Sequence, residues 1–130
     1  MKVFLSWSGE RSKAVATALS TWLADVIQSV VRWMSDHDIQ AGSRWGANLD
    51  SELEQTNFGV LCLESDNLEK PWLLFEAGSL AKSISIARVV PYRLDVSATD
   101  VKPPLSQFQG VDATKEGTLK LIQSINDSHR

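Results

Sequence analysis

The chain has 130 residues, 43% of them hydrophobic and 22% charged, with a formal net charge of -3 at pH 7. That balance is typical of one globular domain with enough apolar surface to form a core, and it excludes an intrinsically disordered chain. Since 16 acidic residues outnumber 13 basic ones, there is no broad basic field and we expect no direct nucleic-acid partner.

The sequence also limits the compartment. No apolar run approaches the ~20 residues that a membrane-spanning helix needs, and the apolar residues after Lys2 are too few for a signal peptide. We therefore expect a cytoplasmic protein without a membrane partner.

The single cysteine, Cys62, lies in the apolar run 58–63 and has no partner for an internal disulfide. We expect it to be a buried, unreactive thiol.

The first part of the chain predicts a strand, a long helix and a second strand. The apolar run 2–6 is typical of a buried strand, and a loop follows at 7–9. From Glu10 to Gln28 the apolar residues recur at helical spacing and predict one amphipathic helix. Residues 30–35 predict the second strand. The buried stripe of the helix is expected to hold Val15, Ala18, Leu19, Trp22, Leu23, Val26 and Ile27.

A long loop and a short helix are expected before the third strand. Residues 36–46 are polar, hold two glycines and show no period, which is typical of a loop. Residues 47–55 predict the short helix. The third strand is expected at 58–63, where the apolar run is continuous, as in a strand with both sheet faces covered.

The remaining chain continues the alternation of helix and strand. Residues 65–82 predict a helical region in which Pro71 suits an early helical position. Residues 87–94 predict a fourth strand, with Pro91 marking an end or an irregularity. The last expected elements are a long loop with one short helix at 95–109, a minimal fifth strand at 111–113, and a helix at 115–126 with Leu119, Ile122 and Ile125 on its apolar side.

Strands that alternate with helices predict an α/β domain with a parallel sheet and helices on both faces. Such sheets bind ligands at the carboxyl ends of their strands. We therefore expect three segments to meet at one rim of the sheet: the loop at 7–9, the loop at 36–46 and the segment 72–76.

Each of these three segments resembles a motif of the TIR (Toll/interleukin-1 receptor) domain family. Val3-Phe4-Leu5-Ser6-Trp7-Ser8 is similar to the motif of the family's first strand, and 38–45 resembles its loop after the second strand. Trp72-Leu73-Leu74-Phe75-Glu76 is similar to the W-x-x-x-E signature of TIR domains that cleave NAD. The motifs occur in the family's order, so the chain is identified as a single TIR-like domain over 1–130, of the bacterial NAD-cleaving type.

The resemblance implies a flavodoxin-like three-layer sandwich with about five parallel strands. It implies an NAD+ glycohydrolase that takes NAD+ as substrate, needs no other cofactor and is activated by self-association, which completes the pocket across subunits. It also implies a role in bacterial anti-phage immunity, either as a domain that stands alone or as the N-terminal effector part of a longer protein, with a sensor or a nucleotide-activated partner. A linear or a cyclic ADP-ribose product depends on which nucleophile reaches the sugar, and the sequence leaves both open.

Glu76 is the candidate catalytic residue. The nicotinamide of NAD+ carries a positive charge, so it leaves without a proton, and one carboxylate suffices to stabilise the oxocarbenium-like sugar. Helical spacing places Glu76 on the same face as Trp72 and between apolar neighbours. From the residues alone, a partly buried glutamate paired with an arginine or with backbone amides explains the pattern equally well. The W-x-x-x-E resemblance favours catalysis.

The other candidate site residues are substrate-binding ones. Trp72 is expected to shape the pocket wall and hold Glu76 in one rotamer, although tryptophans at this spacing are usually core. Trp7 and Trp45 are placed to stack on a nicotinamide or adenine ring, or else to pack against a neighbouring loop.

A second group of candidates suits the phosphates. Arg44 is a candidate for a bidentate phosphate contact, and equally for a solvated loop cation. Hydroxyl or backbone donors are expected from Ser6, Ser8 and Gly9. The cluster 36–38, Asp-His-Asp, has no second ligand cluster, so we expect no metal site.

Two rival functions fit parts of the pattern. A TIR domain that only assembles with other TIR domains would use 36–46 as a docking surface, with Glu76 incidental. A nucleoside deoxyribosyltransferase also uses a glutamate on a similar sheet, but the W-x-x-x-E context and the long second loop fit it less well. A third class, the phosphoacceptor receiver domain, is set aside. It needs acidic residues at the end of strand one, where this chain has Ser6-Trp7-Ser8.

Overall fold

The computed structural model describes residues 2–28, 30–34, 55–85 and 88–129. They form one parallel sheet of five strands in the order β2-β1-β3-β4-β5, the flavodoxin-like order. The predicted fold class is confirmed. The strands are β1 (Lys2–Ser6), β2 (Val31–Met34), β3 (Phe58–Leu63), β4 (Val89–Arg93) and β5 (Val111–Asp112).

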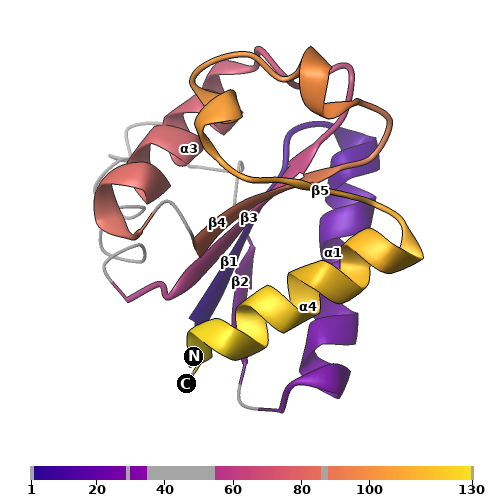
Figure 1. Cartoon of the computed structure of the whole chain (residues 1–130), viewed down its shortest axis with the longest axis vertical. Coiled ribbons are helices and arrows are strands. Elements are labelled where there is room, and N and C mark those ends of the chain that lie inside the picture. Colours follow the sequence, from indigo (N-terminus) through magenta and orange to yellow (C-terminus); the bar gives the residue numbers. More distant parts are fainter. Residues whose placement is uncertain (1, 29, 35–54, 86–87, 130) are drawn as a thin grey trace, which may run out of the picture.

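Within the described ranges, three α-helices cover the two faces of this sheet. Figure 1 shows α1 (Glu10–Val26) and α4 (Lys115–His129) on one face and α3 (Pro71–Ser83) on the other. The connection between β4 and β5 contains two 3₁₀ helices, η2 (Ala98–Asp100) and η3 (Leu105–Gln107), where one short helix was expected. No helix within the described ranges has the length and apolar character to span a membrane.

The strand period of two divides the core between these faces. Val3 and Leu5 pack with α1 and α4, while Phe4, between them, packs with α3. All six residues of β3 are buried, as its continuous apolar run predicted. Helices therefore hold β1 and β3 from both sides, and the ends of these two strands are rigid supports for a site.

Helix α1 forms as predicted but turns a different stripe to the sheet. It ends at Val26, and its buried residues are Ser12, Ala16, Leu19 and Leu23. Trp22 is 40% exposed and Val26 is 46% exposed, so their predicted burial is wrong. The seven-residue stripe was wider than one packing face, and the side with the small residues lies closest to the sheet.

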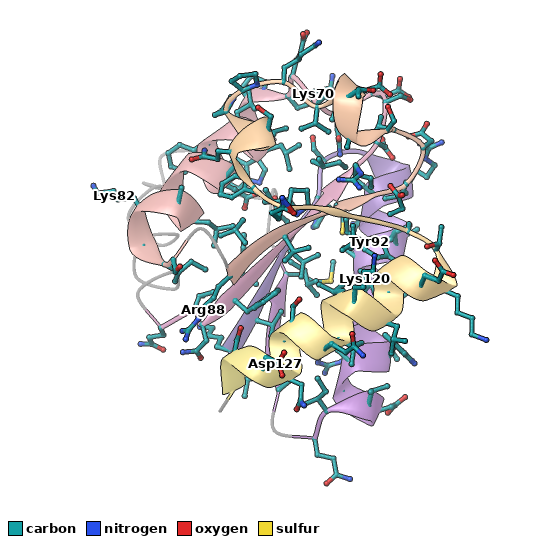
Figure 2. The ribbon with its side chains drawn as sticks, viewed as in Figure 1. Lys70, Lys82, Arg88, Tyr92, Lys120 and Asp127 are labelled. Carbon is teal, nitrogen blue, oxygen red and sulfur yellow. The ribbon has the colours of Figure 1, made fainter. Side chains whose placement is uncertain are left out.

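The same kind of error affects α4. Leu121 and Ile125 are fully buried, whereas Leu119 is 57% exposed. Leu121 and Ile125 follow the buried Gly117 at intervals of four residues, so the three lie on one side of the helix. This side faces the sheet, because Gly117 lies against β5. Tyr92 of β4 lies beside this helix (Figure 2), and its hydroxyl is 2.7 Å from Thr118 Oγ1.

Strand β4 continues through Pro91 instead of ending there. The carbonyl of Arg93 faces β5 and accepts from the N–H of Ala113, so Pro91, two residues earlier, faces the same side. Pairing with β5 begins only at Tyr92. The nitrogen of Pro91, which carries no hydrogen, therefore lies beyond the end of β5, where no hydrogen bond between the strands is needed.

The loop at 36–46 and nearly all of the short helix at 47–55 lie outside the described residues. Gln55, at the end of that segment, is in a turn.

Candidate functional site

Two residues far apart in sequence meet at the carboxyl edge of the sheet. Ser6 is the last residue of β1, and Glu76 lies in the middle of α3. The Ser6 hydroxyl donates to Glu76 Oε1 at 2.6 Å, and both residues are 0% exposed. This contact confirms that the end of the first strand and the W-x-x-x-E segment converge at one rim.

The sequence of α3 explains how its carboxylate comes to be buried. Pro71 occupies the first helical position, for which its fixed φ is suited, and the helix continues to Ser83. Leu73, Ala77 and Leu80 pack into the core on the α3 side of the sheet. Glu76 lies on this face, one residue before Ala77, and so is carried inward with the apolar residues. A buried carboxylate is costly unless donors satisfy it, and the Ser6 hydroxyl is one such donor.

The loop between β1 and α1 is held in a defined conformation. The Ser8 N–H donates to Ser12 Oγ at 3.0 Å, and that hydroxyl donates to the Ser8 carbonyl at 2.8 Å. Gly9 has a φ of 102°, which favours glycine. Trp7 is half-buried, with the Lys13 ammonium 5.2 Å from its ring centroid. The loop therefore presents an aromatic side chain and backbone groups beside Ser6.

An ion-pair network that sequence reasoning missed lies at the same edge. Arg11, in the first turn of α1, contacts Glu64 Oε2 at 3.2 Å and Asp95 Oδ2 at 2.6 Å. The Ser65 N–H donates to Asp95 Oδ1 at 2.8 Å. The hydrogen bond from Arg11, followed by those from Ser65, lowers the pKa of Asp95 to about 2. The same hydrogen bond between Arg11 and Asp95 raises the pKa of Arg11. Acidic residues one or two positions after β3 and β4 were the available signal.

Trp72 and Cys62 lie near their expected environments. Trp72 is half-buried, its ring centroid 6.3 Å from that of Phe75, so it is not a fully enclosed core residue. Cys62 is completely buried, and burial raises the pKa of its thiol to about 12, as expected for an inert core cysteine.

Other predicted features lie outside the described residues. These are Arg44, Trp45 and the Asp-His-Asp cluster at 36–38. Within the part of the chain that is described, no group of three or more His, Cys, Asp or Glu side chains could hold a metal ion.

Comparison with known proteins places the chain in a family. The chain aligns with the TIR domain of the Roq1 resistosome that recognises the effector XopQ, at 19% identity and a TM-score of 0.66, covering 99% of both chains. A TIR-STING receptor from C. gigas in complex with 2′,3′-cGAMP gives 17% identity and a TM-score of 0.70, covering 95% of this chain and 38% of the receptor. A prokaryotic SEFIR domain gives 13% identity and a TM-score of 0.61, covering 97% of this chain and 88% of that one.

These solved structures share the fold, and the sequence supplies the family. No protein of curated function matches the chain. The family model of the TIR domain matches residues 3–124. The chain therefore belongs to the TIR domain family.

Proposed function

We propose that this TIR domain hydrolyses NAD+ at the bond between nicotinamide and ribose, with Glu76 as the catalytic carboxylate. The observation that carries the proposal is the placement of Glu76, which is buried in α3 at the carboxyl edge of the sheet. Its Oε1 accepts a hydrogen bond of 2.6 Å from the Ser6 hydroxyl. Ligands of parallel α/β sheets bind at this edge.

The chemistry asks little more of the protein than one negative charge. As the C–N bond breaks, its electron pair stays with nicotinamide, which leaves neutral, and positive charge develops on the ribose. A fixed carboxylate stabilises that charge without having to reorganise. Attack by water then gives ADP-ribose and a proton, while attack by an atom of the adenosine half gives a cyclic product.

The proposal assigns Ser6 a positioning role. Its hydroxyl holds one carboxylate oxygen of Glu76, and as a fully buried group it acts through Glu76 rather than on the phosphates. Trp7, Ser8 and Gly9 lie on the adjoining loop and are proposed to line the substrate site together with Trp72. For Arg44 and Trp45, phosphate binding and ring stacking remain predictions.

The complete burial of Glu76 has a consequence for activation. NAD+ cannot reach a side chain that is 0% exposed unless the rim of the sheet rearranges. We propose that self-association of the domain drives this rearrangement and completes the pocket, so that dilute protein has low activity. Two solved structures of similar fold belong to a resistosome and to a cyclic-dinucleotide receptor, which supports a place for this domain in an immune assembly. We propose that this assembly serves anti-phage defence in a bacterial host.

Incubation of concentrated, crowded protein with NAD+, followed by chromatography of the products, tests this function. We expect nicotinamide to accumulate together with linear or cyclic ADP-ribose, at a rate per molecule that rises with protein concentration. Assembled protein that releases no nicotinamide would instead support the rival function, a TIR module that only scaffolds other TIR domains.

A further inference from the structure

The turn between β3 and α3 contains a buried amide that joins three parts of the chain. Asn67 is 1% exposed. Its Nδ2 donates to the Cys62 carbonyl at 3.0 Å and to the Ser8 carbonyl at 3.2 Å, and its Oδ1 accepts from the Glu64 N–H at 2.9 Å. One side chain thus ties its own turn and the end of β3 to the loop that follows Ser6.

Neighbouring contacts hold the same loop from the same side. A Cβ at Gly9 would come within 3.0 Å of Glu64 Oε1, so the Glu64 carboxylate lies directly against this residue. Arg11 joins Glu64 to the start of α1. From the other side, the Ser12 hydroxyl donates to the Ser8 carbonyl, which therefore has a donor on each side.

We propose that Asn67 is a positioning residue that fixes the β1–α1 loop, residues 7–9, in the conformation that receives the dinucleotide. This inference rests on the proposed function for its kinetic consequence only. Asn67 is not proposed to touch NAD+, and it acts through the Ser8 carbonyl. The two amide hydrogens of Asn67 Nδ2 bond the Ser8 and Cys62 carbonyls and so fix the distance between the loop and the end of β3. A misplaced loop lowers catalytic efficiency even when the reacting groups are intact.

The decisive variant is Asn67→Asp. It keeps an oxygen for the Glu64 N–H but replaces both amide donors with an acceptor that faces the Ser8 and Cys62 carbonyls. The matched control is Asn57→Ala. Asn57 lies at the amino end of β3, where its Oδ1 accepts from the Lys2 N–H at 2.8 Å, so this variant also loses an asparagine hydrogen bond to backbone, but far from the rim.

Two measurements are made on both variants: hydrogen–deuterium exchange in a peptide covering residues 5–13, and the KM and kcat for NAD+ under assembling conditions. We expect Asn67→Asp to speed exchange in this peptide and to raise KM by roughly tenfold with a smaller fall in kcat, since the loop binds substrate and Glu76 carries the chemistry. Asn57→Ala should change neither.

Equal changes in the two variants, or an unchanged exchange rate and KM in Asn67→Asp, would overturn the inference. If the wild-type protein releases no nicotinamide, the proposed function fails. Exchange alone then decides the inference: faster exchange confined to Asn67→Asp supports a fixed loop, and unchanged exchange refutes it.

Discussion

A buried carboxyl group is costly unless hydrogen-bond donors replace its lost hydration. Glu76 is in that position, and Ser6 is one of its donors. The contact of 2.6 Å lies within the range of O–H···O hydrogen bonds. The hydroxyl therefore satisfies one acceptor oxygen of the buried side chain and restricts the rotamer from which it acts.

Ser6→Ala removes this donor while keeping the strand and its packing. We expect it to destabilise the domain by about 1–3 kcal/mol, because a buried acceptor loses a partner, and to lower kcat by roughly tenfold to a hundredfold. Urea denaturation and nicotinamide release measure the two effects. Ser128→Ala, which removes a hydroxyl bonded to the Ser124 carbonyl near the end of α4, should leave both almost unchanged. Wild-type kcat in Ser6→Ala would remove Ser6 from the mechanism.

Cys62 gives a prediction about reactivity. Burial raises the pKa of its thiol to about 12, so hardly any thiolate exists at about pH 8 in the folded protein, whereas an exposed thiol with a pKa near 8.5 is partly ionised. A disulfide reagent should therefore label no thiol in native protein and one thiol per chain in urea. Rapid labelling of native protein at this pH would contradict the burial of β3.

The Arg11–Asp95 pair gives a prediction about pH. Its hydrogen bonds lower the pKa of Asp95 from 3.8 to about 2, so the unfolded chain takes up a proton before the folded chain does. The stabilisation is complete above about pH 4 and is lost as the pH falls through about 2. Asp95→Asn should therefore have a lower urea midpoint than wild type near neutral pH, and the difference should shrink over this acidic range. A difference in urea midpoint that persists undiminished as the pH falls to about 2 would contradict this pairing.

Sequence reasoning at this scale identified the residues whose signal is local. Glu76 was picked out by the resemblance of 72–76 to the W-x-x-x-E signature, and Ser6 by its place at the end of a strand. Asn67 and Arg11 were missed because each reaches a distant segment, Asn67 the Ser8 carbonyl and Arg11 the acidic residues after β3 and β4. No period or motif in a single chain reports the distance between two such segments.

Secondary structure followed from the sequence more closely than packing did. All five strands and the three described α-helices occur in the predicted order and segments, but α3 begins at Pro71, and residues 65–69, predicted as part of its helical region, form turns. The faces of α1 and α4 that pack on the sheet differ from the predicted ones, because in a helix with many apolar residues the final orientation depends on which side fits closest to the sheet. Ser12 and Ala16 in α1, and Gly117 in α4, decided it.

Two glycines at helical positions give a prediction at the scale of elements. A Cβ at Gly117 would overlap the backbone oxygen of Asp112, where α4 crosses the end of β5, whereas a Cβ at Gly78 in α3 meets nothing within 4 Å. Gly117→Ala should destabilise the domain by about 1–3 kcal/mol or more through overpacking. Gly78→Ala should stabilise it by about 0.5–1 kcal/mol through helix propensity. Urea unfolding that shows equal effects would mean that α4 does not approach β5 this closely.

For the whole molecule, the order of the strands is what makes a site of distant residues. With β1 and β3 side by side near the centre, the loop after β1 and the turn after β3 lie at one edge, where Ser6 meets Glu76 of α3. The alternation of strands and helices predicted this edge, and the TIR resemblance predicted which glutamate would lie there. Neither could predict that the carboxylate is fully covered in the single chain, which is a property of packing.

The most direct test of the account is NAD+ turnover by Glu76→Gln, compared with Glu69→Gln in concentrated, assembled protein. Glu69 is an exposed carboxylate just before α3, so the control removes the same charge from the same region of the chain. We expect Glu76→Gln to release no nicotinamide above background while circular dichroism and light scattering show wild-type folding and self-association, and Glu69→Gln to keep wild-type turnover. Wild-type turnover in a folded, assembled Glu76→Gln protein would contradict the claim that the buried carboxylate performs the reaction.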